Sequence, residues 1–278
     1  MNPSSTTRNY ASIMVCVGLS SHAENHVALA ASLASRFGSL LIGIAAEEAT
    51  LPYLEDGLAT ARPILVENAR NAAMEDLAQA ETNFRRGVGH LPDIEWRSNI
   101  QRPTEFIANQ ARAADLIIVA RSSSGASHRM ITIDAGDAVM ELGRPVLIVP
   151  QNGRSILARR VIVAWKDTRE ARRAVLDALP FLQRAESVTV LSVGDDARDQ
   201  SGEDVCAHLA RHGITSRPMI RTSLSGSYAD TIVDAALEDG SDLIVSGAYG
   251  HNRLREWIFG GVTGDLLADS PIPCLMSH

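Results

Sequence analysis

The chain has 278 residues, enough for two domains of ordinary size. Hydrophobic residues make up 45% of it and aromatic residues only 4%, so its core must come mainly from Ala, Val, Ile and Leu. The net charge is -7 and the isoelectric point is about 5.6. This excludes non-specific binding of nucleic acid through an overall positive charge. We therefore expect no nucleic-acid partner.

The N-terminus and the cysteines indicate where the protein works. The first residues, MNPSSTTRNYAS, lack the apolar core of a signal peptide, and no apolar run reaches the ~20 residues that span a bilayer. The three cysteines, Cys16, Cys206 and Cys274, are odd in number and far apart, which is typical of reduced thiols rather than of a disulfide framework. We expect a cytoplasmic protein that does not contact a membrane.

Short continuous apolar runs in the first half predict buried strands. They occupy residues 13–17, 39–45, 115–120 and 144–150. The first run leads through a polar turn into SSHAENHVALAASLASRF, an Ala-rich segment whose apolar spacing predicts a helix. Such strands alternating with helices indicate βαβ units, and so a parallel sheet covered by helices on both faces.

The second half repeats this pattern. Its apolar runs occupy residues 161–165, 187–193, 242–247 and 272–278, and the first of them leads into DTREARRAVLDALPFL, which again has helical spacing. In an open parallel sheet of this kind, ligands bind beyond the carboxyl ends of the strands, where the strand order reverses. We therefore expect functional residues in the loops that follow these strands.

Two pairs of residues align the halves with each other. Asp115 and Asp242 are 127 residues apart, and Pro145 and Pro273 are 128 apart, so a single one-residue gap aligns both pairs. Between the halves, the sequence PQNGRS at residues 150–155 has the composition of a linker. We predict two domains, residues 1–151 and residues 152–278.

The segment GAYGHNRLREWIFGGVT follows the strand predicted at residues 242–247 and carries four glycines. Glycine lets a backbone approach a ligand closely, and the free amides at the start of a following helix attract an anion. The segment therefore predicts a phosphate site; the alternative is that its glycines only end a strand and turn the chain. The candidate binding residues in this segment are Gly247, Gly250, His251, Arg253, Gly260, Gly261, Val262 and Thr263.

The order glycine, two residues, glycine, nine residues, glycine resembles the ATP-binding branch of the universal stress protein family, and the repeat resembles the tandem members of that family. The resemblance implies two doubly wound, Rossmann-like α/β domains, each with a five-stranded parallel sheet, which mimic the family's dimer by packing RPVLIVP against PIPCLMSH. It also implies a regulatory protein that holds ATP or a related adenine nucleotide, with or without Mg²⁺, in its second half. The backbone at Ala164 and Val193 matches the positions that meet adenine. Whether two such chains also form a homodimer stays open.

The chain departs from the family pattern at two positions. The Ser or Thr that follows the third glycine in the family is Gly261 here, which removes a hydroxyl donor. The Asp that follows the first strand in the family, and meets the adenosine end of the ligand, is Lys166 here, so Asp167 takes that role only if the turn shifts by one residue. The alternative to ATP binding is a tandem protein of the non-nucleotide branch, which binds a protein or another small ligand.

The first half lacks the glycine pattern. After Ala120 it reads RSSSGASHRMITIDAGDAV, and Thr132 and Ile133 stand where the second half has Gly260 and Gly261. We therefore expect no nucleotide in the first half, which would serve as a structural mate of the second.

Other candidate sites have less specific patterns. His208 and His212, like His22 and His26, stand four residues apart, a spacing that holds a metal ion only with further ligands. A solvated helix face is the alternative, and we expect no metal site. Arg169 begins a predicted helix as a candidate contact for an anionic ligand. No catalytic motif such as G-x-S-x-G or H-E-x-x-H appears, so we expect no enzyme.

Overall fold

The computed structural model describes residues 9–50, 62–121, 131–153, 155–222, 227–248 and 262–278. The first half contains, in chain order, β1 (Ser12–Cys16), α1 (Ala23–Phe37), β2 (Leu40–Ala46), α2 (Arg62–Gly87), β3 (Ile94–Asn99), α3 (Pro103–Gln110), the 3-10 turn η2 (Ala111–Ala113), β4 (Leu116–Ala120), α4 (Ala135–Glu141) and β5 (Val146–Val149). The second half contains β6 (Arg160–Ala164), α5 (Arg169–Asp177), α6 (Leu179–Leu182), β7 (Ser187–Val193), the 3-10 turn η3 (Ala197–Gln200), α7 (Gly202–Arg211), β8 (Ser216–Arg221), α8 (Tyr228–Asp239), β9 (Leu243–Gly247), α9 (Val262–Asp269) and β10 (Cys274–Ser277).

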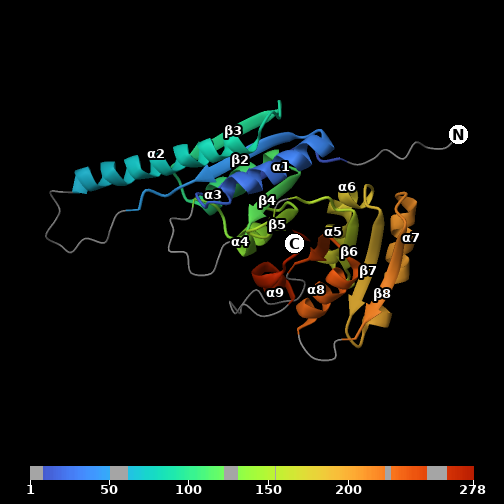
Figure 1. Ribbon diagram of the computed structural model, residues 1–278. Helices are drawn as coiled ribbons and strands as arrows, with labels where there is room; N and C mark the ends of the chain where they lie inside the picture. The colour runs from blue at the N-terminus through green and yellow to red at the C-terminus, as the bar shows by residue number, and fades with distance from the viewer. Residues whose placement is uncertain (1–8, 51–61, 122–130, 154, 223–226, 249–261) are drawn as a thin grey trace.

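These strands form one continuous ten-stranded sheet in the order β3-β2-β1-β4-β5-β10-β9-β6-β7-β8 (Figure 1). Each half contributes five parallel strands, while β5 and β10 pair antiparallel, with Ile148 opposite Cys274 and Val146 opposite Met276. The predicted fold class and the predicted packing of the two final strands are therefore confirmed. Because the junction is antiparallel, the strands of the first half and the strands of the second half run in opposite directions. Their carboxyl ends therefore point to opposite sides of the sheet. We retain the division at residues 151 and 152, between β5 and β6, as a proposal.

Helices cover both faces of this sheet. One buried cluster joins the sheet to α1, α2, α5, α6 and α7, and a second joins it to α3, α4, α8 and α9. Each cluster contains residues of both halves, so burial of apolar surface stabilises the two halves together. Among the helices that the structure describes, none combines the length and the apolar character needed to cross a membrane.

The repeated aspartates explain why the halves share an alignment. Asp115 Oδ2 accepts hydrogen bonds from the amides of Ala11 at 2.8 Å and Ser12 at 3.1 Å, where β1 begins. Asp242 accepts equivalent bonds from the amides of Arg159 at 3.2 Å and Arg160 at 3.1 Å, where β6 begins. Each carboxylate thus satisfies amides at the start of the central strand of its own half.

The aligned prolines correct two predicted strand boundaries. The runs at residues 144–150 and 272–278 predict longer strands than β5 and β10, which begin directly after Pro145 and Pro273, at Val146 and Cys274. Proline has no amide hydrogen to give to a neighbouring strand, but its carbonyl can accept. Accordingly, the carbonyls of both prolines accept hydrogen bonds, one from Ile117 at 3.1 Å and the other from Ile244 at 3.0 Å.

Three aromatic rings connect the halves on one face of the sheet. Tyr10 and Phe37 of the first half meet Phe181 of the second, with ring centroids 5.6 and 5.1 Å from Phe181 respectively. The Tyr10 hydroxyl donates to the carbonyl of Asp177 at 2.6 Å, and burial raises the pKa of this phenol. The buried hydroxyl therefore has the hydrogen-bond partner that a tyrosine in a core requires.

The cysteines are buried or half-buried, and none forms a disulfide. Burial raises the pKa of the Cys16 thiol to about 12 and that of the Cys274 thiol to about 11. Both thiols stay protonated at neutral pH, and a protonated thiol is a poor nucleophile. The predicted reduced, buried state of these two residues fits this environment.

His26 of α1 holds the connection between the halves. Its Nε2 lies 3.0 Å from the carbonyl of Gln151, and the side chain is buried, which lowers its pKa. The unfolded chain, in which the pKa of His26 is near 6.5, therefore takes up a proton at a higher pH than the folded chain does. The contribution of His26 to the free energy of unfolding is complete above pH 6.5 and is lost as the pH falls below that value.

We expect His26→Gln to weaken the loss of stability on acidification, since glutamine keeps a donor for Gln151 but does not titrate. Urea unfolding at pH 7.5 and pH 5.5 measures this, with the exposed His90→Gln as the matched control. An equal loss of stability in the wild type and in the His26 variant would contradict the assignment.

Candidate functional site

Three of the predicted ligand-binding residues lie together at one edge of the sheet. Ala164, Val193 and Gly247 are the last residues of β6, β7 and β9. In the sheet, β6 lies between the other two strands, and Ala164 is opposite Leu191 on one side and Ser246 on the other. The carboxyl ends of three adjacent parallel strands therefore form one surface, as the strand order predicts.

Helix α9 is the next described element after β9 in the chain. Val262 and Thr263 are its first two residues, and the helix ends at Asp269. Val262 packs against the same buried cluster as Ala164 and Val193. The remaining predicted binding residues lie outside the described residues: Gly250, His251, Arg253, Gly260 and Gly261.

Asp167 lies in the loop between β6 and α5, where two contacts hold it. Its amide donates to Gln200 Oε1 at 2.8 Å, and its Oδ1 accepts two bonds from the guanidinium of Arg172, at 2.6 and 3.0 Å. Trp165 donates its indole N–H to the carbonyl of Gln200 at 2.7 Å. Gln200 therefore fixes the shape of this loop, a role that no sequence motif indicates.

Gly247 is tightly packed against α5. A Cβ at this position would lie 2.4 Å from the amide nitrogen of Ala171 and 2.7 Å from the carbonyl carbon of Glu170. Thr168 caps the same helix by accepting a hydrogen bond from the Ala171 amide at 3.2 Å. The close packing of α5 therefore explains why this residue is glycine. The approach of a ligand, predicted from the spacing of the glycines, is a second explanation.

A small hollow of about 300 Å³ opens beside α5 and the last residue, lined by Arg169, Glu170, Arg173 and His278. Only 3% of Glu170 is exposed, and its carboxylate pairs with Arg169. Burial raises the pKa of this carboxyl, but hydrogen bonds, the first from Arg169, outweigh burial, so that the pKa lies below its usual value. Arg169, a candidate ligand for an anion, is thus already engaged by a carboxylate.

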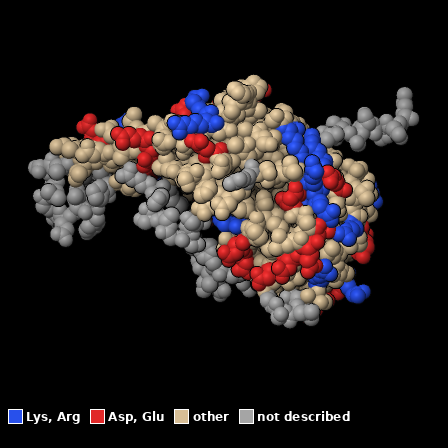
Figure 2. Space-filling view, viewed as in Figure 1, with Lys and Arg blue, Asp and Glu red and all other residues tan. Residues whose placement is uncertain are grey.

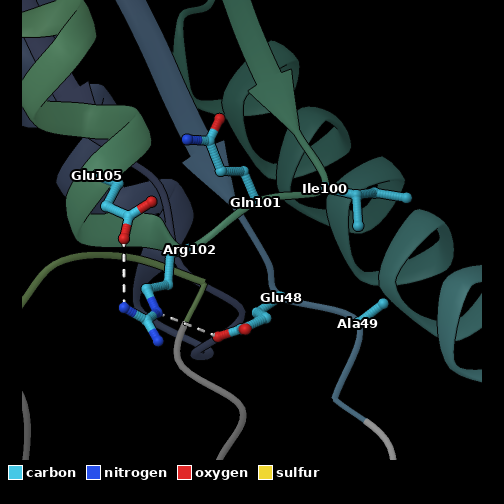
Figure 3. A pocket seen from close by; sticks show the side chains of 6 residues that line it. All are labelled: Glu48, Ala49, Ile100, Gln101, Arg102 and Glu105. Carbon is cyan, nitrogen blue, oxygen red and sulfur yellow. Dashed lines mark hydrogen bonds and ion pairs between the residues drawn. The ribbon is translucent and has the colours of Figure 1, made fainter.

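The first half has a larger hollow at the carboxyl ends of β2 and β3, with a volume of about 580 Å³ (Figure 3). In it, Arg102 lies between Glu48 at 3.6 Å and Glu105 at 3.2 Å. Two carboxylates offset the one guanidinium, so these side chains do not make a site for phosphate. Its other lining residues are Ala49, Ile100 and Gln101.

Neither histidine pair lies wholly on a solvated helix face, and for His26, which is buried, that expectation is wrong. His208 belongs to α7, whereas His212 follows the last residue of that helix, and their ring centroids lie 4.9 Å apart. His22 precedes α1, and His26 is turned toward Gln151. Within the described part of the chain, no three His, Cys, Asp or Glu side chains gather as a metal site would require.

Over the second half, basic and acidic side chains gather in neighbouring bands on the face shown in Figure 2. Arg160 and Arg217 both pair with Asp239, at 3.6 and 2.5 Å, and Arg221 pairs with Glu238 at 2.9 Å. Such pairing keeps the local field weak. That the protein has no nucleic-acid partner stays a prediction.

Comparison with known proteins relates the C-terminal part to one family. Residues 210–278 match the universal stress protein family. A 53-residue segment is 42% identical to the stress response protein NhaX of Bacillus subtilis (strain 168). That segment covers 19% of this chain and 32% of NhaX, so the match spans about a third of the length of this curated relative.

Solved structures share the fold over nearly the whole chain. A universal stress protein from Archaeoglobus fulgidus DSM 4304 aligns with a TM-score of 0.66 and 16% identity over 96% of each chain. The protein PA1789 from Pseudomonas aeruginosa PAO1, described as functionally unknown, aligns with a TM-score of 0.57 and 16% identity, over 96% of this chain and 92% of its own.

Proposed function

We propose that this chain is a universal stress protein that acts in a stress response, and that its second half, residues 152–278, binds ATP or a related adenine nucleotide; the match of residues 210–278 to that family supports this. The observation that carries the proposal is the meeting of Ala164, Val193 and Gly247 at adjacent strand ends, together with the start of α9 at Val262, which packs against the same buried cluster. A surface of this kind combines backbone groups for a base with helix amides for phosphate.

The residues present fit such a ligand in part. Backbone at Ala164 and Val193 would meet the base, and the amides of Val262 and Thr263 would face the phosphates, since the start of a helix carries partial positive charge. Of Asp167, only Oδ1 is engaged by Arg172, so Oδ2 is the oxygen for the ribose hydroxyls. A Mg²⁺ ion would be held mainly by the phosphates themselves. We propose that the protein binds the nucleotide without hydrolysing it.

We expect Thr263→Val to weaken nucleotide binding about tenfold, because a hydrogen bond to a charged group contributes about 1.5 kcal/mol. Titration of a fluorescent ATP analogue into the purified protein measures the affinity. The matched control is Thr82→Val in α2 of the first half, where the hydroxyl donates to the carbonyl of Ala78 at 2.9 Å. Wild-type protein that shows no binding at millimolar nucleotide would refute the proposed function.

The ion pair between Asp167 and Arg172 favours a second candidate, a protein of the non-nucleotide branch that binds a partner or another small ligand. A carboxylate already neutralised by a guanidinium is a weaker acceptor for ribose. Mass spectrometry of the small molecules that co-purify with the protein separates the candidates. A bound adenine nucleotide supports the first, whereas protein free of nucleotide, with a thermal stability indifferent to added ATP, supports the second.

A further inference from the structure

An arginine of the first half holds the helix on which the proposed phosphate site begins. Arg121 follows β4 directly, and its guanidinium donates from Nη2 to the carbonyl of Leu266, in the last turn of α9, at 3.2 Å and from Nη1 to that of Ser270, which directly follows the helix. The last carbonyls of a helix lack partners within it and carry partial negative charge. Arg121 therefore satisfies and neutralises the end of a helix that belongs to the other half.

Burial and further hydrogen bonds surround this contact. The Arg121 side chain is half-buried, and burial lowers the pKa of its guanidinium. A half-buried charge is costly to move away from its hydrogen-bond acceptors, which favours this position of the guanidinium. Ser270 is itself buried, and its hydroxyl exchanges hydrogen bonds with Ile272, accepting from the amide at 3.2 Å and donating to the carbonyl at 2.8 Å. The end of α9 is thus attached both to Arg121 and to the residues that precede β10.

An arginine of the second half makes a similar contact with the end of a helix in the first half. Arg173 of α5 donates to the carbonyl of Gly143 at 3.1 Å, just beyond the end of α4. Both α4 and α9 precede the final strand of their own half, and each ends against an arginine of the other half. The two helices differ at their first residues. Only α9 begins with residues that we propose to bind phosphate, Val262 and Thr263.

We propose that Arg121 is a positioning residue for the nucleotide site of the second half, an inference that rests on the proposed function. The eight residues of α9 span only about 12 Å, so a displacement of the end held by Arg121 also displaces the end that carries Val262 and Thr263. The first half, which we expect to bind no nucleotide itself, thereby sets the phosphate-binding geometry of the second.

The test compares Arg121→Met with the wild type in a titration of fluorescent ATP. We expect the variant to bind about fivefold more weakly, a typical size for coupling between separated groups. Arg121→Lys keeps the charge but loses the two-pronged geometry, and we expect its affinity to lie between the two. The matched control is Arg144→Met, which removes an arginine that also donates to a backbone carbonyl, that of Arg112 at 3.4 Å, but within the first half. This control should bind as the wild type does.

A second measurement reads the helix directly. In nucleotide-free protein, we expect the amides of α9 to exchange hydrogen with solvent faster in Arg121→Met than in Arg144→Met. Lowered thermal stability with unchanged ATP affinity would show that Arg121 is only structural and would overturn the inference. If Arg121→Met does not fold, wild-type affinity in Arg121→Lys would overturn it as well. Absence of ATP binding in the wild type would refute the proposed function itself, a result distinct from these.

Discussion

Phe181→Ala is expected to lower the free energy of unfolding by about 4 kcal/mol, because the change removes a fully buried ring and leaves a cavity. The ring contributes more than apolar area, since it packs edge-on to Phe37 with centroids 5.1 Å apart, across the boundary of the halves. Equilibrium unfolding in urea, followed by circular dichroism, measures the loss.

A double-mutant cycle separates the contact between the halves from simple cavity formation. Phe37 and Phe181 should show a coupling energy of about 1 kcal/mol, because each single change removes the same ring contact. The matched cycle pairs Phe181 with Phe84, which packs on Trp96 inside the first half with centroids 5.4 Å apart. That second cycle should be additive. Additivity in both cycles would show that the rings do not join the halves.

The strands that sequence predicts correctly are those buried on both sides. Eight of the ten occur as continuous apolar runs, because a central parallel strand is covered by helices on both faces. The other two, β3 with the sequence IEWRSN and β8 with SRPMIR, lie at the outer edges of the sheet; β3 is mostly half-buried and β8 mostly exposed. Their polar residues remove the apolar signal, and charged residues or proline at an edge discourage pairing with another chain.

The junction between the halves could be predicted only through the resemblance. The apolar runs at residues 144–150 and 272–278 indicate two buried strands but not that they pair with each other. Contacts such as Arg121 with Ser270 or Arg173 with Gly143 join residues far apart in the chain. An arginine that caps a distant helix leaves no periodicity or spacing in the sequence, so these contacts required the structure.

The sequence predicts where the candidate site lies, but it does not predict the contacts within it. Strand ends and the start of α9 follow from pattern alone, and Ala164, Val193 and Val262 do lie along one buried cluster. The local partners of Asp167 do not follow from pattern, since Arg172 and Gln200 reach it through the geometry of a turn. Whether these residues bind nucleotide stays a prediction.

Gly247→Ala is expected to destabilise the protein by about 3 kcal/mol in the absence of any ligand. The added Cβ would lie 2.4 Å from the Ala171 nitrogen and 2.7 Å from the Glu170 carbonyl carbon, and both are backbone atoms that cannot rotate away. The start of α5 would therefore have to move away from β9. Urea unfolding of nucleotide-free protein measures the effect.

The control is Gly18→Ala, two residues beyond the carboxyl end of β1 in the first half, where a Cβ would meet no atom within 4 Å. We expect this change to alter stability by less than about 0.5 kcal/mol. If Gly247 serves only the approach of a ligand, Gly247→Ala would leave the nucleotide-free protein as stable as Gly18→Ala does, and the close packing of α5 on β9 would be contradicted. A loss confined to Gly247→Ala instead means that this glycine is required before any ligand binds, because the same strand end both supports α5 and borders the proposed site.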